Sequence, residues 1–524
     1  MVQQSSTDPK CAKPTIRILL YTDDPNGITN GDEQFGLGTM IRHLFAHKPF
    51  FADVCIEWIS RFSSEGIPEQ KLDALLKDEN KKYDEVWFFG TFQATRKKFI
   101  SKAVRGGPES ELNKTEVEVL GEWMAVGPDQ HMRGGGVLMT GDHNQTLVKG
   151  TLPSGENPLC PESSETPKFL GLGRAIGRCV PRAGRLRRWE GEPATNDPRH
   201  SFNTQVPSGG FDIESQILQL DANPQRLFLS GFDFKGETAT NGFPHPLFFY
   251  RTGRLIRSFP DHVHEGAVVL PTDNELKDEK EWPKIIIQPK PRVVARGIDS
   301  RNCSSINLLA AYNGDCVAVG RIVADSTWHH YVGVNLEEFP SPSLPNTPAD
   351  QIGQFYANLA IWLAPRRKRF DMSCVMFEWV ANHVVMIEEI GGDPINIGRA
   401  AYAALAQVAS PCEISELLDA AVPDYIRKLY ESIYFPDSNL VLSPFPSKIL
   451  LLGCIVNSFH QSQIEKANAE EKYEKPSSEE LIATGFKDAL MLHAKHIEPI
   501  AFEANRNAYL EDVPNSNKPK NQER

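Results

Sequence analysis

Short apolar segments alternate with helical segments through the first 145 residues, and this alternation restricts the possible fold most strongly. Apolar runs occur at 15–23 (TIRILLYTD), 54–60 (VCIEWIS), 83–92 (YDEVWFFGTF) and 134–143 (GGGVLMTGDH). Runs this short and this apolar are typical of strands that are buried on both faces. Strands separated by helices form parallel sheets. The sequence therefore predicts an α/β fold with a flavodoxin-like parallel sheet covered by helices.

Two changes in composition divide the rest of the chain. Pro, Gly, Ser and charged residues replace the alternation after residue 145, and a Pro/Ser-rich stretch begins at 341. Beyond it, apolar residues recur at spacings of three and four, as in amphipathic helices. The predicted parts are a flexible N-terminus (1–14), an α/β domain (15–340) with an irregular insertion at about 145–225, a linker (341–350), an all-helical C-terminal domain (351–513) and a disordered tail (514–524).

Charge and cysteine content limit the classes of partner. The formal net charge of −12 disfavours nonspecific binding to nucleic acid or to anionic membranes. The nine cysteines include no CxxC pair, which favours a reducing compartment over a disulfide framework. No apolar run approaches the roughly 18 residues of a membrane span, and the N-terminus lacks the apolar core of a secretory signal. We therefore expect a cytoplasmic protein that acts on a small molecule, without membrane or nucleic-acid partners.

The segment GRIVADSTWHH (320–330) places polar residues at the end of an apolar strand. A carboxylate and an imidazole are costly to bury unless they are paired, and such a pair can perform acid–base catalysis. Adjacent histidines on an extended chain face opposite sides, so we expect either His329 or His330, together with Asp325, to enter a site. The alternative is a core histidine that bonds a backbone carbonyl, with Trp328 packed on the sheet.

A second acid–imidazole pair follows the strand that ends near residue 140. Gly141 permits a sharp turn, which would leave Asp142 and His143 pointing outward as a general base or a metal site. The alternative is a turn in which Asp142 caps the next helix. Because ligands bind beyond the carboxyl ends of parallel strands, we expect this pair and the 325–330 cluster to share one edge of the sheet.

Two further segments have an ion-binding composition. Six arginines lie between 174 and 188 with no acid before Glu190. Their guanidinium groups suit phosphate or carboxylate, although a solvated surface is the alternative. In FPDHVHEG (259–266), His262 and His264 would face the same side of an extended segment and could bind one divalent metal ion with Glu265. The alternative for this segment is a surface turn.

Five segments carry a resemblance to a known fold: IRILLYTDD, VWFFGTF, GGGVLMTGDH, HPLFF and GRIVADSTWHH. Residues 15–340 resemble the class I glutamine amidotransferase-like fold, and within it the ThuA-like (trehalose-utilisation-like) branch. Amidotransferases of this fold carry a cysteine nucleophile where Met139–Asp142 stand here, so thiol-dependent glutamine hydrolysis is not expected. The ThuA-like branch also lacks that cysteine, and the resemblance implies carbohydrate-related chemistry only in general terms.

The leading interpretation is a hydrolase-like enzyme that acts on a small polar substrate by acid–base or metal-assisted chemistry. The alternative is a non-catalytic ligand-binding or assembly module, whose helical domain docks a protein partner or a second copy. The predicted catalytic residues are Asp142, His143, Asp325, His329 and His330. The predicted substrate-binding residues are Asp24, Asn144, Gln145, Arg182, Arg185, Arg187, Arg188, Ser326 and Trp328.

Overall fold

The computed structural model divides the chain into two compact units. Unit 1 comprises residues 1–226, 232–376 and 405–435, and unit 2 comprises 227–231, 377–404 and 436–524. The residues that the structure describes are 12–22, 28–33, 36–62, 70–78, 80, 82–89, 114–127, 133–140, 214–217, 219–220, 245–251, 254–261, 291–298, 305–315, 318–325, 327–336, 347–383, 392–422, 448–468 and 476–511.

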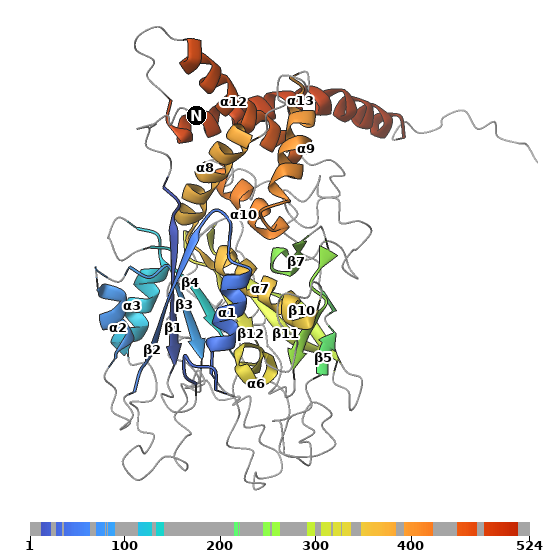
Figure 1. Cartoon of the computed structure of the whole chain (residues 1–524). Coiled ribbons are helices and arrows are strands. Elements are labelled where there is room, and N and C mark those ends of the chain that lie inside the picture. The colour runs from blue at the N-terminus through green and yellow to red at the C-terminus, as the bar shows by residue number, and fades with distance from the viewer. Residues whose placement is uncertain are drawn as a thin grey trace, which may run out of the picture. The chain divides into compact units, whose positions relative to one another are not determined.

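An eight-stranded sheet forms the centre of unit 1 (Figure 1). Its first five strands are parallel and follow the order 2-1-3-4-12, which is the flavodoxin-like order. Three antiparallel strands extend it beyond β12. In sheet order the strands are β2 (Asp53–Ser60), β1 (Thr15–Thr22), β3 (Glu85–Phe89), β4 (Gly136–Met139), β12 (Ile322–Asp325), β11 (Ser305–Tyr312), β10 (Arg292–Ile298) and β6 (Gln219–Leu220). The predicted α/β class is confirmed, and the antiparallel extension was not predicted.

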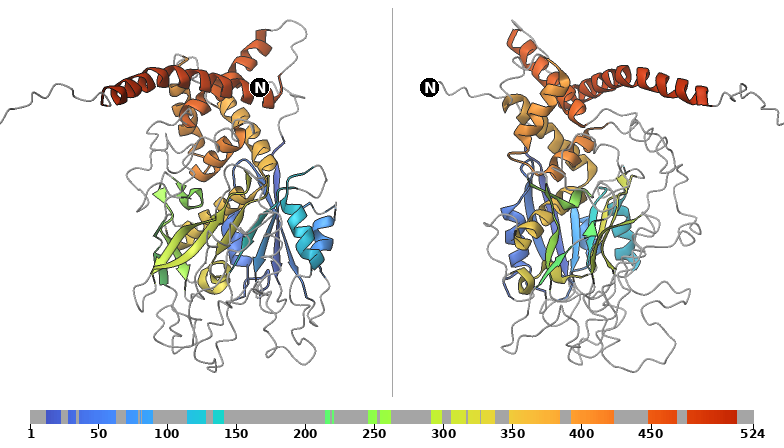
Figure 2. Two further views of the ribbon diagram at one scale, coloured as in Figure 1. Left: turned by 180° about the vertical axis from the view of Figure 1, so that it is seen from behind. Right: turned by 90° about the vertical axis from the view of Figure 1, so that its right-hand side faces the viewer.

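Helices cover both faces of the parallel strands. Leu19, Tyr21 and Phe88 pack in one apolar cluster with residues of α2 (Leu72–Lys77) and α3 (Lys114–Met124). The right-hand view of Figure 2 shows that α1 and these two helices lie on opposite sides of the sheet. Because side chains alternate along a strand, the neighbouring residues of each strand face the α1 side.

The α1 face is covered mainly by α1 (Gly38–Ala46) and α7 (Pro348–Leu363), which pack against each other. Every residue of α7 from Ala349 to Leu363 is buried, as expected for a helix enclosed by other elements. Its end lies directly on β4, since a Cβ at Gly136 would come within 2.1 Å of the Leu363 carbonyl oxygen. Glycine at this position therefore permits the close contact between helix and sheet.

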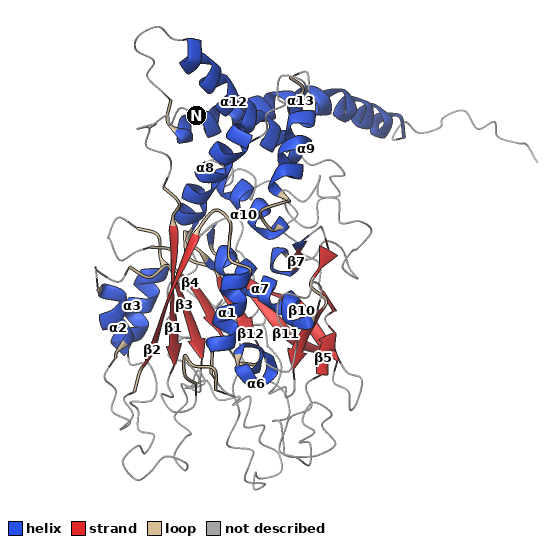
Figure 3. Ribbon diagram, in the orientation of Figure 1, coloured by secondary structure: helices blue, strands red, loops and turns tan. Residues whose placement is uncertain are grey.

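The C-terminal helices divide between the two units. α10 (Pro411–Ala421) and α7 belong to unit 1, whereas the sequence assigned both to a separate helical domain. The described residues of unit 2 are all helical or in short turns (Figure 3). They comprise part of α8 (Arg366–His383), most of α9 (Pro394–Leu405), and α12 (Lys448–Asn468) with α13 (Ser478–Glu511). No helix in the described part of the chain has the length and apolar character needed to cross a bilayer.

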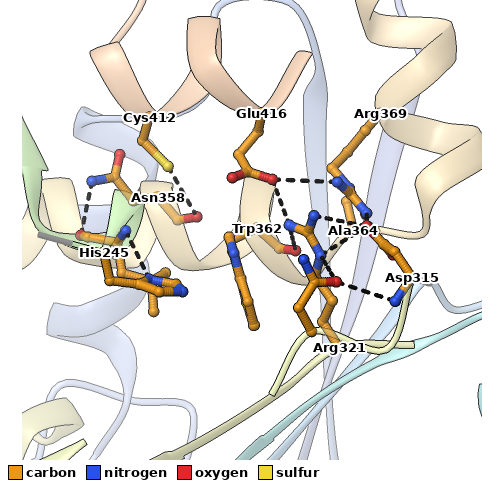
Figure 4. A network of polar contacts seen from close by, with 11 residues as sticks. His245, Asp315, Arg321, Asn358, Trp362, Ala364, Arg369, Cys412 and Glu416 are labelled. Atoms are coloured by element: carbon orange, nitrogen blue, oxygen red, sulfur yellow. Dashed lines mark hydrogen bonds and ion pairs between the residues drawn. The ribbon is translucent and has the colours of Figure 1, made fainter. Parts of the chain in front are cut away.

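A buried ion network anchors the amino end of β12 (Figure 4). Arg321 precedes this strand and binds Asp315 (Nη2 to Oδ2, 2.7 Å) as well as Glu416 of α10. Arg369 of α8 binds the same two acids, at 2.6 and 3.3 Å. The Arg321 guanidinium also lies 4.8 Å from the ring centroid of Trp362. With two cations and two anions, the network joins α7, α8 and α10 to the sheet.

The pKa values of the two arginines shift in opposite directions in this network. Burial lowers the pKa of Arg321, but attraction by Asp315 and Glu416 is stronger, so the net shift is upward. Burial and repulsion by Arg321 lower the pKa of Arg369. Asp315 and Glu416 each contact both guanidinium groups. Because these negative charges stabilise the protonated form, both arginines remain protonated in the folded chain.

Candidate functional site

The parallel strands end at one edge of the sheet. The register pairs Thr22 with Phe89, Phe88 with Met139 and Ala324 with Met139. The last residues of β1, β3, β4 and β12 therefore lie within one residue of the same level. Ligands of doubly wound sheets bind beyond this edge, near the point where the strand order reverses. Here the reversal lies between β1 and β3.

Asp325 ends β12 and forms a buried pair with His330. The Nδ1 atom of His330 lies 2.9 Å from Oδ2 and 3.0 Å from Oδ1 of the carboxylate. Tyr331 donates its hydroxyl to Oδ2 at 3.0 Å, and the backbone N–H of Thr327 donates to Oδ1 at 3.2 Å. The carboxylate thus accepts three hydrogen bonds, which compensates for its removal from water.

A tight turn brings these groups together. Residues His329–Tyr331 form a 3₁₀ turn, and Thr327 Oγ1 accepts from the backbone N–H of His329 at 3.0 Å. The prediction of an extended backbone at His329 and His330 is therefore wrong. His330 turns toward Asp325, whereas the His329 ring stacks on Trp328 with 4.1 Å between centroids.

Aromatic rings surround the pair. Phe259 lies edge-on to His330 at 5.2 Å, and Phe89 of β3 lies 5.3 Å from Tyr331. Tyr356 of α7 donates its hydroxyl to the backbone carbonyl of His330. Burial, with the nearby Asp325 charge, raises the pKa of both tyrosines well above the usual value. Both phenols therefore stay protonated and serve as hydrogen-bond donors.

The loop between β1 and α1 lies beside the turn. The backbone N–H of Gly333, at the start of α6 (Gly333–Leu336), donates to the Gly36 carbonyl at 2.9 Å. Within the loop, the N–H groups of Gly36, Leu37 and Gly38 all donate to loop carbonyls. The segment after Asp325 therefore returns across the strand ends toward β1, and it fixes the loop that precedes α1.

The structure describes only part of the predicted site. Asp325 and His330 contact each other, and Trp328 and His329 lie in the adjoining turn. In the described residues, no group of three or more His, Cys, Asp or Glu side chains is placed to hold a metal ion. The predicted residues outside the described ranges are Asp24, Asp142, His143, Asn144, Gln145, Arg182, Arg185, Arg187, Arg188, His262, His264, Glu265 and Ser326.

Three residues of the cluster were not predicted. Thr327 and Tyr331 lie in or next to the segment already recognised as polar, so a search for donors within six residues of Asp325 finds them. Tyr356 lies 26 residues from His330 on a wholly buried helix. Its sequence context predicts core packing, and only the tertiary structure shows its contact with the turn.

The pair has the geometry of an oriented imidazole. A carboxylate that accepts from Nδ1 holds the proton on that nitrogen and leaves the lone pair on Nε2, the form that acts as a general base. Comparisons of the chain with protein-family models, with curated proteins and with solved structures found no match. The chemistry of the site therefore rests on its own geometry.

Proposed function

We propose that the protein is an acid–base enzyme that acts on a small polar substrate at the carboxyl edge of its sheet. His330 is the general base or acid, and Asp325 holds its tautomer and orientation. The observation that carries the proposal is the short contact between His330 Nδ1 and both Asp325 oxygens at the end of β12. Proton transfer by a positioned imidazole contributes about 10²–10⁴-fold to a rate.

The resemblance to the ThuA-like branch supports a carbohydrate-derived substrate, and hydrolase-like chemistry on it is part of the proposal. The parallel strand order 2-1-3-4-12 is consistent with the amidotransferase-like fold that the resemblance implies. The predicted metal ligands remain a prediction, and His330 requires no metal to act as a base.

A screen for turnover tests the proposal. Wild-type protein is incubated with a defined mixture of sugars, polyols, acetylated sugars and sugar phosphates, and the loss of each compound is followed by mass spectrometry. We expect at least one compound to be consumed, and we expect Asp325→Asn to slow its consumption about a hundredfold or more, because the amide no longer enforces the Nδ1–H tautomer. Circular dichroism verifies that the variant is folded. Equal rates for both proteins would contradict the proposal.

A second candidate function is a binding module without turnover. Its supporting observation is the burial of the pair, since Asp325 and His330 are each 0% exposed. The three donors to Asp325 described above also come from the next six residues, as in a purely local structural turn. In the same screen, a compound that raises the melting temperature without being consumed would favour this candidate.

A further inference from the structure

Hydroxyl and carboxylate side chains occupy three of the four strand ends in a row along the carboxyl edge of the sheet, and Phe89 occupies the fourth. Leu19, Tyr21, Met139 and Ala324 face α2 and α3, so the residues that follow Tyr21, Met139 and Ala324 face the α1 side. These are Thr22, Thr140 and Asp325, at the ends of β1, β4 and β12. All three are nearly or fully buried. Phe89 of β3 follows Phe88 of the same apolar cluster, pairs with Thr22 and also faces the α1 side. Thr22 therefore lies at the strand-order reversal, and the apolar Phe89 side chain stands between it and the other two.

The two threonines of the row differ in their bonding. Thr140 Oγ1 donates to the Phe88 carbonyl at 3.0 Å. Thr22 is 0% exposed, and its Oγ1 makes no hydrogen bond within the described part of the chain. Its backbone is held in place, because the N–H of Arg61 donates to the Thr22 carbonyl at 2.8 Å. A buried hydroxyl without a partner destabilises a folded chain, and such groups in native proteins call for an explanation.

The loop beside this row indicates which kind of ligand fits. Glu33 accepts from the Thr29 hydroxyl at 2.5 Å, and this hydrogen bond lowers the Glu33 pKa, so the side chain is ionised. The N–H groups of Gly36, Leu37 and Gly38 are already used inside the loop. Within the described residues, these features disfavour a phosphate at the loop. They are compatible with an uncharged molecule that offers hydroxyl groups.

We infer that Thr22 Oγ1 is a substrate-recognition group that hydrogen-bonds a hydroxyl of an uncharged polyhydroxy ligand. The inference rests on the proposed function, because it takes the carboxyl edge as the place where substrate binds. Sites that hydrogen-bond a substrate hydroxyl discriminate strongly against compounds that lack it. Within the described residues the Thr22 hydroxyl has no hydrogen-bond partner, and a bound ligand hydroxyl would supply one.

The isosteric variant Thr22→Val tests this assignment, with Thr140→Val as the matched control. Removing an unpaired buried hydroxyl should leave the melting temperature equal or higher, whereas removing the bonded one should lower it by about 2–4 °C. Thr22→Ser, which keeps the hydroxyl, provides a second readout. The binding probes are glycerol, myo-inositol and glucose, with glucose 6-phosphate and inorganic phosphate as the anionic arm, measured by calorimetry.

We expect at least one uncharged probe to bind the wild type, about tenfold weaker binding to Thr22→Val, and near wild-type binding to Thr22→Ser. The inference is overturned if Thr22→Val lowers the melting temperature as much as Thr140→Val, if it binds as the wild type does, or if only the anionic probes bind. Turnover that survives in His330→Gln would instead refute the proposed catalytic role. Weakened binding by Thr22→Val would then still support the recognition site.

Discussion

His330 Nδ1 lies 2.9 Å from Oδ2 of Asp325, and the Tyr331 hydroxyl reaches the same oxygen at 3.0 Å. Two donors thus converge on one carboxylate oxygen at the end of a buried strand. The three groups lie within seven consecutive residues of the chain. This local cluster determines both how the turn folds and which imidazole nitrogen carries the proton.

Removing the carboxylate should destabilise the fold. Asp325→Ala leaves three donors without their acceptor, and we expect the free energy of unfolding to fall by about 3 kcal/mol. Urea unfolding followed by fluorescence measures this loss. Asp53→Ala is the control, because its ion pair with Lys13 is largely exposed and should contribute less than about 1 kcal/mol. Equal effects of the two substitutions would show that the buried cluster is not stabilising.

The ion network at the other end of β12 gives a second stability prediction. Glu416→Gln leaves Arg321 and Arg369 with Asp315 as their common carboxylate. We expect this variant to lose about 3 kcal/mol in urea unfolding, because a buried charge becomes poorly compensated.

The control for the network is Arg367→Ala, which breaks an exposed ion pair with Asp371 one helical turn away. It should cost about 0.5 kcal/mol or less. A Glu416→Gln loss as small as that of the control would contradict the structural role of the network.

The structure explains why parts of this arrangement could be predicted and others could not. Strand alternation and the polar end of GRIVADSTWHH placed Asp325 and a histidine at the edge of the sheet, because both signals are local. The network depends on Arg321 and Glu416, which are 95 residues apart, and neither residue is distinctive in its own segment. The choice of His330 over His329 depends on a 3₁₀ turn, which the periodicity of a strand does not reveal.

Protonation of His43 of α1 should lower the free energy of unfolding at acidic pH. Burial, followed by repulsion from His47 and Arg42, lowers its pKa from 6.5 to about 4. Between pH 4 and 6.5 the unfolded chain binds more protons than the folded chain. The contribution of neutral His43 to the free energy of unfolding is therefore complete above pH 6.5 and is lost as the pH falls toward 4. A shift of this size corresponds to about 3 kcal/mol. Chemical unfolding of wild type and His43→Gln from pH 7 to 4 should show a shallower decline in the variant. Parallel curves would refute the assignment.

Glu413 of α10 should give stability the opposite pH dependence, with a contribution that decreases as the pH rises. Its carboxylate accepts from the backbone N–H groups of Phe50 and Phe51 at 3.1 and 2.8 Å, but burial is stronger and raises its pKa from 4.5 to about 7. The folded chain binds the proton more tightly, so this stability is present below pH 4.5 and is lost as the pH rises to 7.

Replacing Glu413 with Gln keeps an oxygen acceptor for one of the two amides and removes the titration. As the pH rises from 5 to 8, the wild type should lose stability that Glu413→Gln does not lose. We therefore expect the free energy of unfolding of the variant to rise relative to that of the wild type. A constant difference would mean that Glu413 titrates alike in the folded and unfolded chains.

The turnover of two adjacent histidine variants tests the central claim most directly. His330→Gln removes the imidazole bonded to Asp325, whereas His329→Gln removes the neighbouring ring that stacks on Trp328. With the substrate found in the screen and with melting temperatures compared in parallel, the account predicts a loss of about 10²-fold or more for His330→Gln and a near wild-type rate for His329→Gln. A folded His330→Gln protein that turns over as fast as His329→Gln would contradict the account.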